Sequence, residues 1–140
     1  DVQQAAGDLA GARASYAEGH QILQRLAADN PSSADARRGV SVSLNKLGNV
    51  QQAAGDLAGA RASYAESLQI GRRLAADNPS SAEARRDVAV SLVKLAQIPG
   101  SGVRWKEPYQ AMQAMKNDGV LAPSDEKLLA ALKQRADAEP

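Results

Sequence analysis

The sequence predicts an all-α protein, and three observations lead to this fold class. Its 140 residues include 29 alanines but one Trp, three Tyr and no Phe, a composition that favours helices over pleated strands. Residues 2–49 return as residues 50–97, with 38 of the 48 positions identical. Within each copy, apolar residues recur at helical spacing between helix-stop signals. A β-sandwich or barrel is excluded.

Segments that end and begin helices occur at the same place in both copies. Residues 30–33 and 78–81 are both Asn-Pro-Ser-Ser, and a proline here prevents a helix from continuing. Ser32 and Ser80 are each followed three residues later by an acidic residue, the pattern of a capping box. We therefore expect a new helix to begin after each of these segments.

The complete copy is expected to form two antiparallel helices, over residues 33–54 and 56–77, separated at Gly55 and Asp56. Glycine adopts the left-handed turn readily, and Asp is a good cap for the next helix. Both helices carry an apolar stripe at helical spacing. The stripes consist of Val40, Leu44, Leu47 and Ala54 in the first helix, and Leu57, Ala60, Tyr64, Leu68 and Leu74 in the second.

By the same register, residues 1–6 are expected to be the end of an earlier helix, with further helices over 9–29 and 81–97. The similarity to the repeat then stops. A turn at Gly100-Ser101-Gly102 precedes a helix that begins near Pro108, since proline fits only a helix's first turn. Ser124 is expected to cap a last helix.

The chain accordingly divides into two regions. Residues 1–98 hold the repeats, with 1–49 containing a partial first unit and the start of a second, and 50–98 containing the remainder. Residues 99–140 form a divergent helix pair that ends in a C-terminal cap. Because the repeat register begins in mid-unit, the chain is expected to be the C-terminal piece of a longer array.

Several positions resemble the tetratricopeptide repeat (TPR), which places a large apolar residue, Leu-Gly, Gly-Asp, a small Ala and an aromatic residue in that order. They are Leu44, Leu47, Gly48, Gly55, Asp56, Ala60 and Tyr64. The 48-residue unit is similar to the extended TPR units of multi-repeat bacterial proteins and kinesin light chains. The resemblance implies an α-solenoid, a TPR-like superhelix in which Gly48 lies at a close helix crossing and Tyr16 and Tyr64 occupy packed positions.

Residues suited to catalysis are few. The only histidine, His20, corresponds to Leu68 in the second copy, so we interpret it as a packed residue. The Gly100-Ser101-Gly102 segment lacks the strand and the Gly-Lys-Ser/Thr of a phosphate loop, and the adjacent acids Asp125 and Glu126 suit a helix N-terminus. We predict no catalytic, cofactor-binding or metal-binding residues and no enzymatic activity.

Charge and cysteine content narrow the possible partners. Lys and Arg total 17 against 16 Asp and Glu, a net charge of +1, and the two signs are interspersed. We therefore expect no nucleic acid and no membrane as partners, and no apolar run approaches the ~20 residues that span a bilayer. The lack of cysteine excludes disulfides and thiolate zinc sites but identifies no compartment. The cytoplasm is our working expectation.

Paired arginines recur at Arg37-Arg38 and Arg85-Arg86. Asp35 lies three residues before Arg38, and Glu83 lies three residues before Arg86. Because residues three apart are neighbours on a helix, we interpret these arginines as part of a solvated, ion-paired face. An anion-binding contact is the alternative.

A polar stripe lies beside the apolar stripe of the first helix of the unit. In TPR proteins this helix lines a concave groove, so the resemblance implies a peptide-binding site there and on the next equivalent helix. The candidate residues are Arg38, Asn45, Lys46, Asn49, Gln52, Lys94 and Gln97, with Ser41 on the same stripe. The alternative is a solvated polar face without a ligand.

The predicted function is therefore that of a protein-protein interaction scaffold that binds a partner protein or peptide through the groove of a TPR solenoid. Two alternatives are a regulatory or sensor segment of a larger signalling enzyme and an architectural, self-associating array. We also expect the isolated chain to self-associate through its N-terminal end. Without its partner helix, the face that bears Tyr16, His20 and Leu23 would be partly uncovered.

Overall fold

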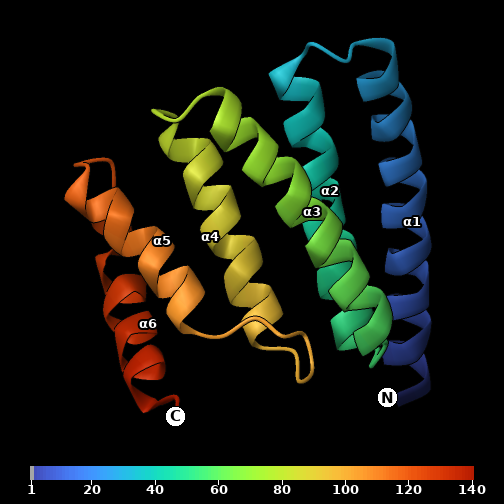
Figure 1. The fold of residues 1–140 in the computed structure, drawn as a ribbon. Helices are drawn as coiled ribbons and strands as arrows, with labels where there is room; N and C mark the ends of the chain where they lie inside the picture. Colours follow the sequence, from blue (N-terminus) through green and yellow to red (C-terminus); the bar gives the residue numbers. More distant parts are fainter. Residues whose placement is uncertain (1) are drawn as a thin grey trace. The chain divides into compact units, whose positions relative to one another are not determined.

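The computed structural model describes the backbone of residues 2–140 and the side chains from residue 5 onward, and in this part the protein is all-α (Figure 1). The helices pack as sequential antiparallel neighbours, which confirms the predicted all-α class. They are α1 (Val2–Asp29), α2 (Ala34–Ala53), α3 (Leu57–Asp77), α4 (Ala82–Ala96), α5 (Lys106–Asn117) and α6 (Glu126–Ala138), with a short 3-10 turn, η1 (Pro123–Asp125), before α6.

The chain forms two compact units, and α3 passes from one into the other. The first unit ends at Ile70 and the second begins at Gly71. The first therefore contains α1, α2 and most of α3, and the second contains the end of α3 and all later helices. In the repeat, α2 and α4 are equivalent and are called A-type helices below, while α1 and α3 are called B-type helices.

Serine side chains cap both A-type helices, one residue later than the sequence pattern indicated. The backbone N–H of Ala36 donates to Ser33 Oγ, and that of Ala84 donates to Ser81 Oγ, both at 3.1 Å. Ser33 and Ser81 have extended backbone angles directly before the first helical residue, which is the geometry that lets a side chain reach the third N–H of a helix. The expected caps at Ser32 and Ser80 were therefore wrong by one position.

In the first unit, α2 and α3 cross closely at Gly48, as predicted. A Cβ added to Gly48 would lie only 2.6 Å from Tyr64 Cε1. Tyr64 and Ala60 are fully buried. The ring thus occupies the space that a side chain at position 48 would fill, and the absence of that side chain allows the two helices to approach.

The expected break at Gly7-Asp8 does not occur. Residues 2–18 and 50–66 have the same sequence, yet α1 runs through its copy as one unbroken helix (Figure 1). The second copy turns at Gly55, which has φ +82°, and the Gly59 N–H then donates to Asp56 Oδ1 at 2.9 Å. Asp1, which was assigned to the end of an earlier helix, lies outside the described residues.

The second unit has a core that α4, α5 and α6 share. Its buried members are Ala89, Met112, Leu129 and Leu132, and Trp105 and Tyr109 pack against them. At the edge of this core, the Arg135 guanidinium lies 4.5 Å from the centre of the Trp105 ring, a cation-π contact. The C-terminal helix α6 therefore contributes apolar residues to this core.

The start of α6 differs from the prediction. Ser124 lies within η1, and α6 begins after Asp125, whose side chain makes no capping hydrogen bond. Asp125 instead accepts two hydrogen bonds from Arg86 of α4, at 2.8 and 3.1 Å. A charge-assisted pair with two parallel bonds is stronger than a single cap bond, so the carboxylate faces α4 rather than its own helix.

Candidate functional site

The polar stripe of α2 packs against α3 along much of its length. The Ser41 and Ser67 hydroxyl oxygens lie 2.8 Å apart, and both residues are buried. The Tyr64 hydroxyl lies 2.6 Å from Asn49 Oδ1, to which it donates, and 3.2 Å from Gln52 Oε1. The carbonyl oxygens of these two amides are therefore used within the α2–α3 pair, on the side where a free peptide groove was expected.

The other candidates on α2 differ in accessibility. Lys46 is exposed, whereas Arg38 and Asn45 are partly buried and already interact with other residues of the chain. Lys46 and Asn49 are thus the α2 candidates whose side chains are exposed, and the Asn49 carbonyl oxygen also accepts a hydrogen bond from Tyr64. A lysine ammonium is a compact donor that pairs readily with a carboxylate.

Lys94 and Gln97 belong to the second unit, on and just after α4. Lys94 is partly buried and Gln97 is exposed. Gln97 is also the C-terminal cap of α4, and its backbone N–H donates to the Val93 carbonyl at 3.2 Å. Lys94 occupies the same repeat position as Lys46, so the chain presents one lysine on each A-type helix.

The only histidine is packed, as predicted. His20 is 9% exposed, and its Nδ1 lies 2.8 Å from Ser43 Oγ. The Ser43 hydroxyl also donates to the Val40 carbonyl at 2.8 Å, an arrangement in which His20 Nδ1 donates to the serine oxygen. The hydrogen bond joins α1 to α2, and both residues are buried.

The three residues expected to mediate self-association lie in different environments. Tyr16 is 40% exposed, His20 is buried, and Leu23 is partly buried. A Cβ added to Gly39 of α2 would lie 3.5 Å from Leu23 Cδ2. The antiparallel neighbour α2 thus covers the C-terminal part of this face and leaves Tyr16 accessible, which corrects the expectation that Tyr16 is packed like Tyr64.

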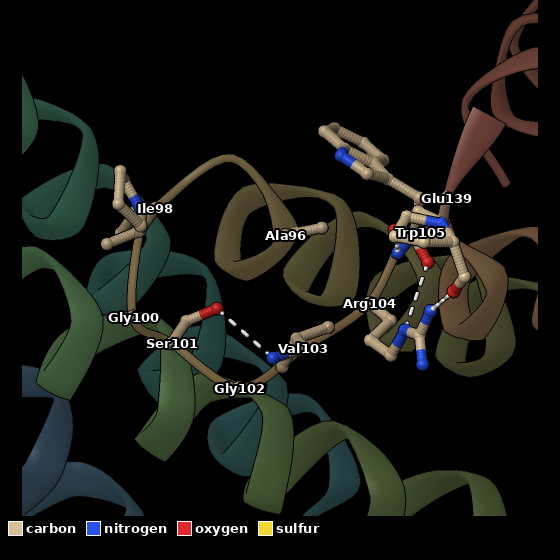
Figure 2. A pocket seen from close by; sticks show the side chains of 11 residues that line it. Ala96, Ile98, Gly100, Ser101, Gly102, Val103, Arg104, Trp105 and Glu139 are labelled. Atoms are coloured by element: carbon tan, nitrogen blue, oxygen red, sulfur yellow. Dashed lines mark hydrogen bonds and ion pairs between the residues drawn. The ribbon is translucent and has the colours of Figure 1, made fainter.

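A cavity of about 570 Å³ lies in the second unit beside the loop that follows α4 (Figure 2). Gly100 and Gly102 both have φ +80°, which explains the glycines at this turn. Ser101 Oγ donates to the Leu95 carbonyl and accepts from the Val103 N–H. The serine thus fixes the loop, as expected for a turn rather than a phosphate loop.

The far side of this cavity is formed by the end of the chain. Arg104 Nε donates to Glu139 Oε2 at 3.3 Å, and Arg104 Nη2 donates to the Pro140 carbonyl. The Trp105 backbone N–H also donates to Glu139. The charged groups around the cavity are therefore paired with one another, and Figure 2 shows the arginine and the glutamate directed toward each other.

Two ion pairs of the second unit had no signal in the local sequence. Arg86 binds Asp125, which is 39 residues away, and Arg85 binds Asp118 at 2.8 Å. The hydrogen bonds from Arg86 hold the pKa of Asp125 below its usual value, although burial of the carboxylate acts in the opposite direction. The local sequence indicates only pairs three residues apart, such as Glu83 and Arg86.

No protein-family model, curated protein or solved structure matches this chain. Within residues 2–140, no group of three or more His, Cys, Asp or Glu side chains is placed to hold a metal ion. None of the helices in this part of the chain combines the length and the apolar character that crossing a membrane requires.

Proposed function

We propose that the chain is a helical-repeat interaction module that binds a partner protein or peptide through the exposed surface of its A-type helices. The supporting observation is that Lys46 of α2 and Lys94 of α4 occupy the same position in successive repeats. Each A-type helix therefore offers one lysine at the same place in its repeat, and a lysine ammonium pairs readily with a carboxylate of a partner. The partner favoured by this arrangement carries carboxylates.

We further propose that the helices form a TPR-like solenoid. Its support is the packing of the residues on which the resemblance rests: the Gly48–Tyr64 crossing, the buried Ala60 and the turn at Gly55. Stacked helix pairs of this kind produce extended binding surfaces. The amides of Asn49 and Gln52 stabilise the pair, so recognition rests on Lys46, Lys94 and Gln97.

The test is selection from a library of peptides with free C-termini, displayed against the immobilised chain. We expect enrichment of peptides rich in Asp and Glu or dependent on their terminal carboxylate. Charge reversal by Lys46→Glu or Lys94→Glu should weaken the best peptide about tenfold, equivalent to about 1.4 kcal/mol.

The matched control is Lys127→Glu on α6, where the lysine is exposed and lies outside the repeats. This variant should bind the selected peptide as the wild type does. Equal weakening by all three charge reversals would indicate non-specific electrostatics and contradict the proposal, as would the failure of any peptide to be enriched.

A further inference from the structure

Several positions that differ between the two repeats lie where helices meet. Repeats this similar are prone to misassembly, because each B-type helix is offered two A-type helices of almost the same sequence. The differing positions are buried or partly buried on both types of helix. On the B-type helices they are 19, 20 and 23 of α1 against 67, 68 and 71 of α3, and on the A-type helices they include 39 and 41 of α2 against 87 and 89 of α4.

In the first repeat, a large side chain on α1 faces a glycine on α2. Leu23 is partly buried, and a Cβ added to Gly39 would lie 3.5 Å from Leu23 Cδ2. The leucine therefore reaches α2 at a place where α2 carries no side chain. Three residues earlier on α1, His20 Nδ1 lies 2.8 Å from Ser43 Oγ, a contact that the equivalent Leu68 of α3 has no polar atom to make.

In the second repeat, the glycine lies on the B-type helix instead. Gly71 near the end of α3 is buried, and a Cβ added there would lie 3.3 Å from Val88 Cγ2. Asp87, directly before Val88, occupies the repeat position of Gly39 and is partly buried. The combination of Leu on the B-type helix and Gly on the A-type helix has thus become Gly and Asp.

A further difference joins α2 to α3. The Ser41 and Ser67 hydroxyl oxygens lie 2.8 Å apart, and Ser67 Oγ also donates to the Ser41 carbonyl at 2.9 Å. In α4 the equivalent of Ser41 is Ala89, which shares a core with Met112. In α1 the equivalent of Ser67 is Gly19. Because neither replacement has a hydroxyl, this reciprocal pair requires α2 and α3 together.

We propose that positions 23 and 39, with their equivalents 71 and 87, determine which A-type helix each B-type helix accepts. If α1 docked on α4, Leu23 would lie over the Asp87 carboxylate and separate a charged group from water. If α3 docked on α2, Gly71 would face Gly39, and the space that Leu23 fills would stay empty. Both exchanges are disfavoured, so each B-type helix keeps its own partner. This pairing rule does not depend on the proposed peptide site.

The α1–α2 pair of the full chain can host all four combinations, so the pairing rule is testable without a mispaired molecule. Gly39→Asp creates the combination that α1 would form with α4. Leu23→Gly creates the combination that α3 would form with α2. The double variant carries the combination native to the second repeat. Urea unfolding followed by circular dichroism measures the unfolding equilibrium constant of each variant and of the wild type.

Each single variant should unfold more readily than the wild type, and the double variant should recover part of the loss. The reason is that a carboxylate at position 39 is open to water once Leu23 is absent. We expect the double variant to have an unfolding constant about tenfold smaller than two independent effects would give, a coupling of about 1.4 kcal/mol. The cycle isolates this coupling, because helix propensity and the loss of leucine cancel in it.

The matched control is Gly39→Ala. Its Cβ would meet Leu23 at an ordinary van der Waals distance, and alanine is the better helix former, so this variant should unfold no more readily than the wild type. If Gly39→Ala is as destabilising as Gly39→Asp, position 39 excludes every side chain and does not discriminate by charge, which would overturn the proposal. A coupling below about threefold between Leu23→Gly and Gly39→Asp would also overturn it.

The second repeat provides a cycle that does not depend on α1. Gly71→Leu alone should raise the unfolding constant at least about tenfold, because the new side chain would crowd Val88 and Asp87. Asp87→Gly in the same chain should reduce that effect, since it restores the combination that packs in the first repeat. If Asp87→Gly gives no relief, position 87 does not select the residue at position 71, and the proposal fails.

Discussion

Gly48 and Gly11 are both glycines inside a helix, but their surroundings differ. A Cβ at Gly48 would lie 2.6 Å from Tyr64, whereas a Cβ at Gly11 would meet no atom within 4 Å. We expect Gly48→Ala to lower the free energy of unfolding by about 1–3 kcal/mol through overpacking. Gly11→Ala should raise it by about 0.5–1 kcal/mol, because alanine is the better helix former.

Urea unfolding of both variants measures these two effects. Since the substitution is the same, its intrinsic helix propensity is the same at both positions, and only the local packing differs. A stabilising effect at Gly48 would show that the α2–α3 crossing is looser than the structure indicates.

Because Asp125 pairs with Arg86, we expect the free energy of unfolding to depend on pH. Because the pKa of Asp125 is lower in the folded chain than in the unfolded chain, the unfolded state binds more protons at acidic pH. The stabilisation by Arg86 is therefore complete well above the unfolded value of about 3.9 and is lost as the pH falls through the folded pKa. At pH 7, Asp125→Asn should cost about 1.5 kcal/mol, and this difference from the wild type should shrink toward pH 3.

The neighbouring Glu126 provides the control. It pairs with Lys116 at 3.2 Å, and both side chains are about half exposed, so Glu126→Gln should change the stability little at any pH. Urea titrations at several pH values between 7 and 3 compare the variants. A constant difference between Asp125→Asn and the wild type over this range would contradict the assigned pair.

At the scale of elements, residues 2–18 and 50–66 show that one sequence can form either one helix or two. The turn at Gly55 is supported by α2, which presents Gly48, Asn49 and Gln52 to Tyr64. Among the described residues, no helix packs against Tyr16 of α1 as α2 packs against Tyr64. Continuing the helix then satisfies more backbone hydrogen bonds than turning does.

Alanine substitution at the two equivalent glycines should therefore have opposite effects. Gly55→Ala places a Cβ on a residue with φ +82° and should destabilise the chain by about 1–2 kcal/mol. Gly7→Ala lies inside α1 and should stabilise it by about 0.5–1 kcal/mol. Urea unfolding tests both, and a similar loss of stability at both positions would indicate that α1 also turns at Gly7 in solution.

At the scale of the whole molecule, helices that follow one another in the chain pack together within each unit. Polar links reach further along the sequence: Arg13 binds Asp56, Arg86 binds Asp125, and Arg104 binds Glu139. Ion pairs of this kind join residues whose separation follows no helical period. They are features of the assembled fold and not of any one helix.

The sequence alone was sufficient to predict the all-α class, the positions of α2, α3 and α4 and the close crossing at Gly48. These features depend on local signals: helical spacing of apolar residues, prolines and serines between helices, and glycine at a crossing or a turn. The same signals placed the N-terminal caps of α2 and α4 one residue too early.

Whether the candidate peptide-binding residues are available to a ligand depended on the tertiary structure. The stripe of Asn49 and Gln52 has the polarity of a binding surface, but the hydroxyl of Tyr64 engages both amides. Helical periodicity shows which residues share a face; it does not show whether that face meets solvent or a neighbouring helix.

The two copies of residues 2–18 and 50–66 show most clearly what the local sequence decides and what the tertiary contacts decide. Because they are identical, the sequence within them cannot account for the exposure of Tyr16, the burial of Tyr64 or the turn that forms at Gly55 and not at Gly7. Only the helix packed against each copy differs. The local sequence determined where helices could form and where they could turn, and the tertiary contacts of α2 decided which possibility each copy adopts, since a turn is favourable only where the faces it brings together are buried.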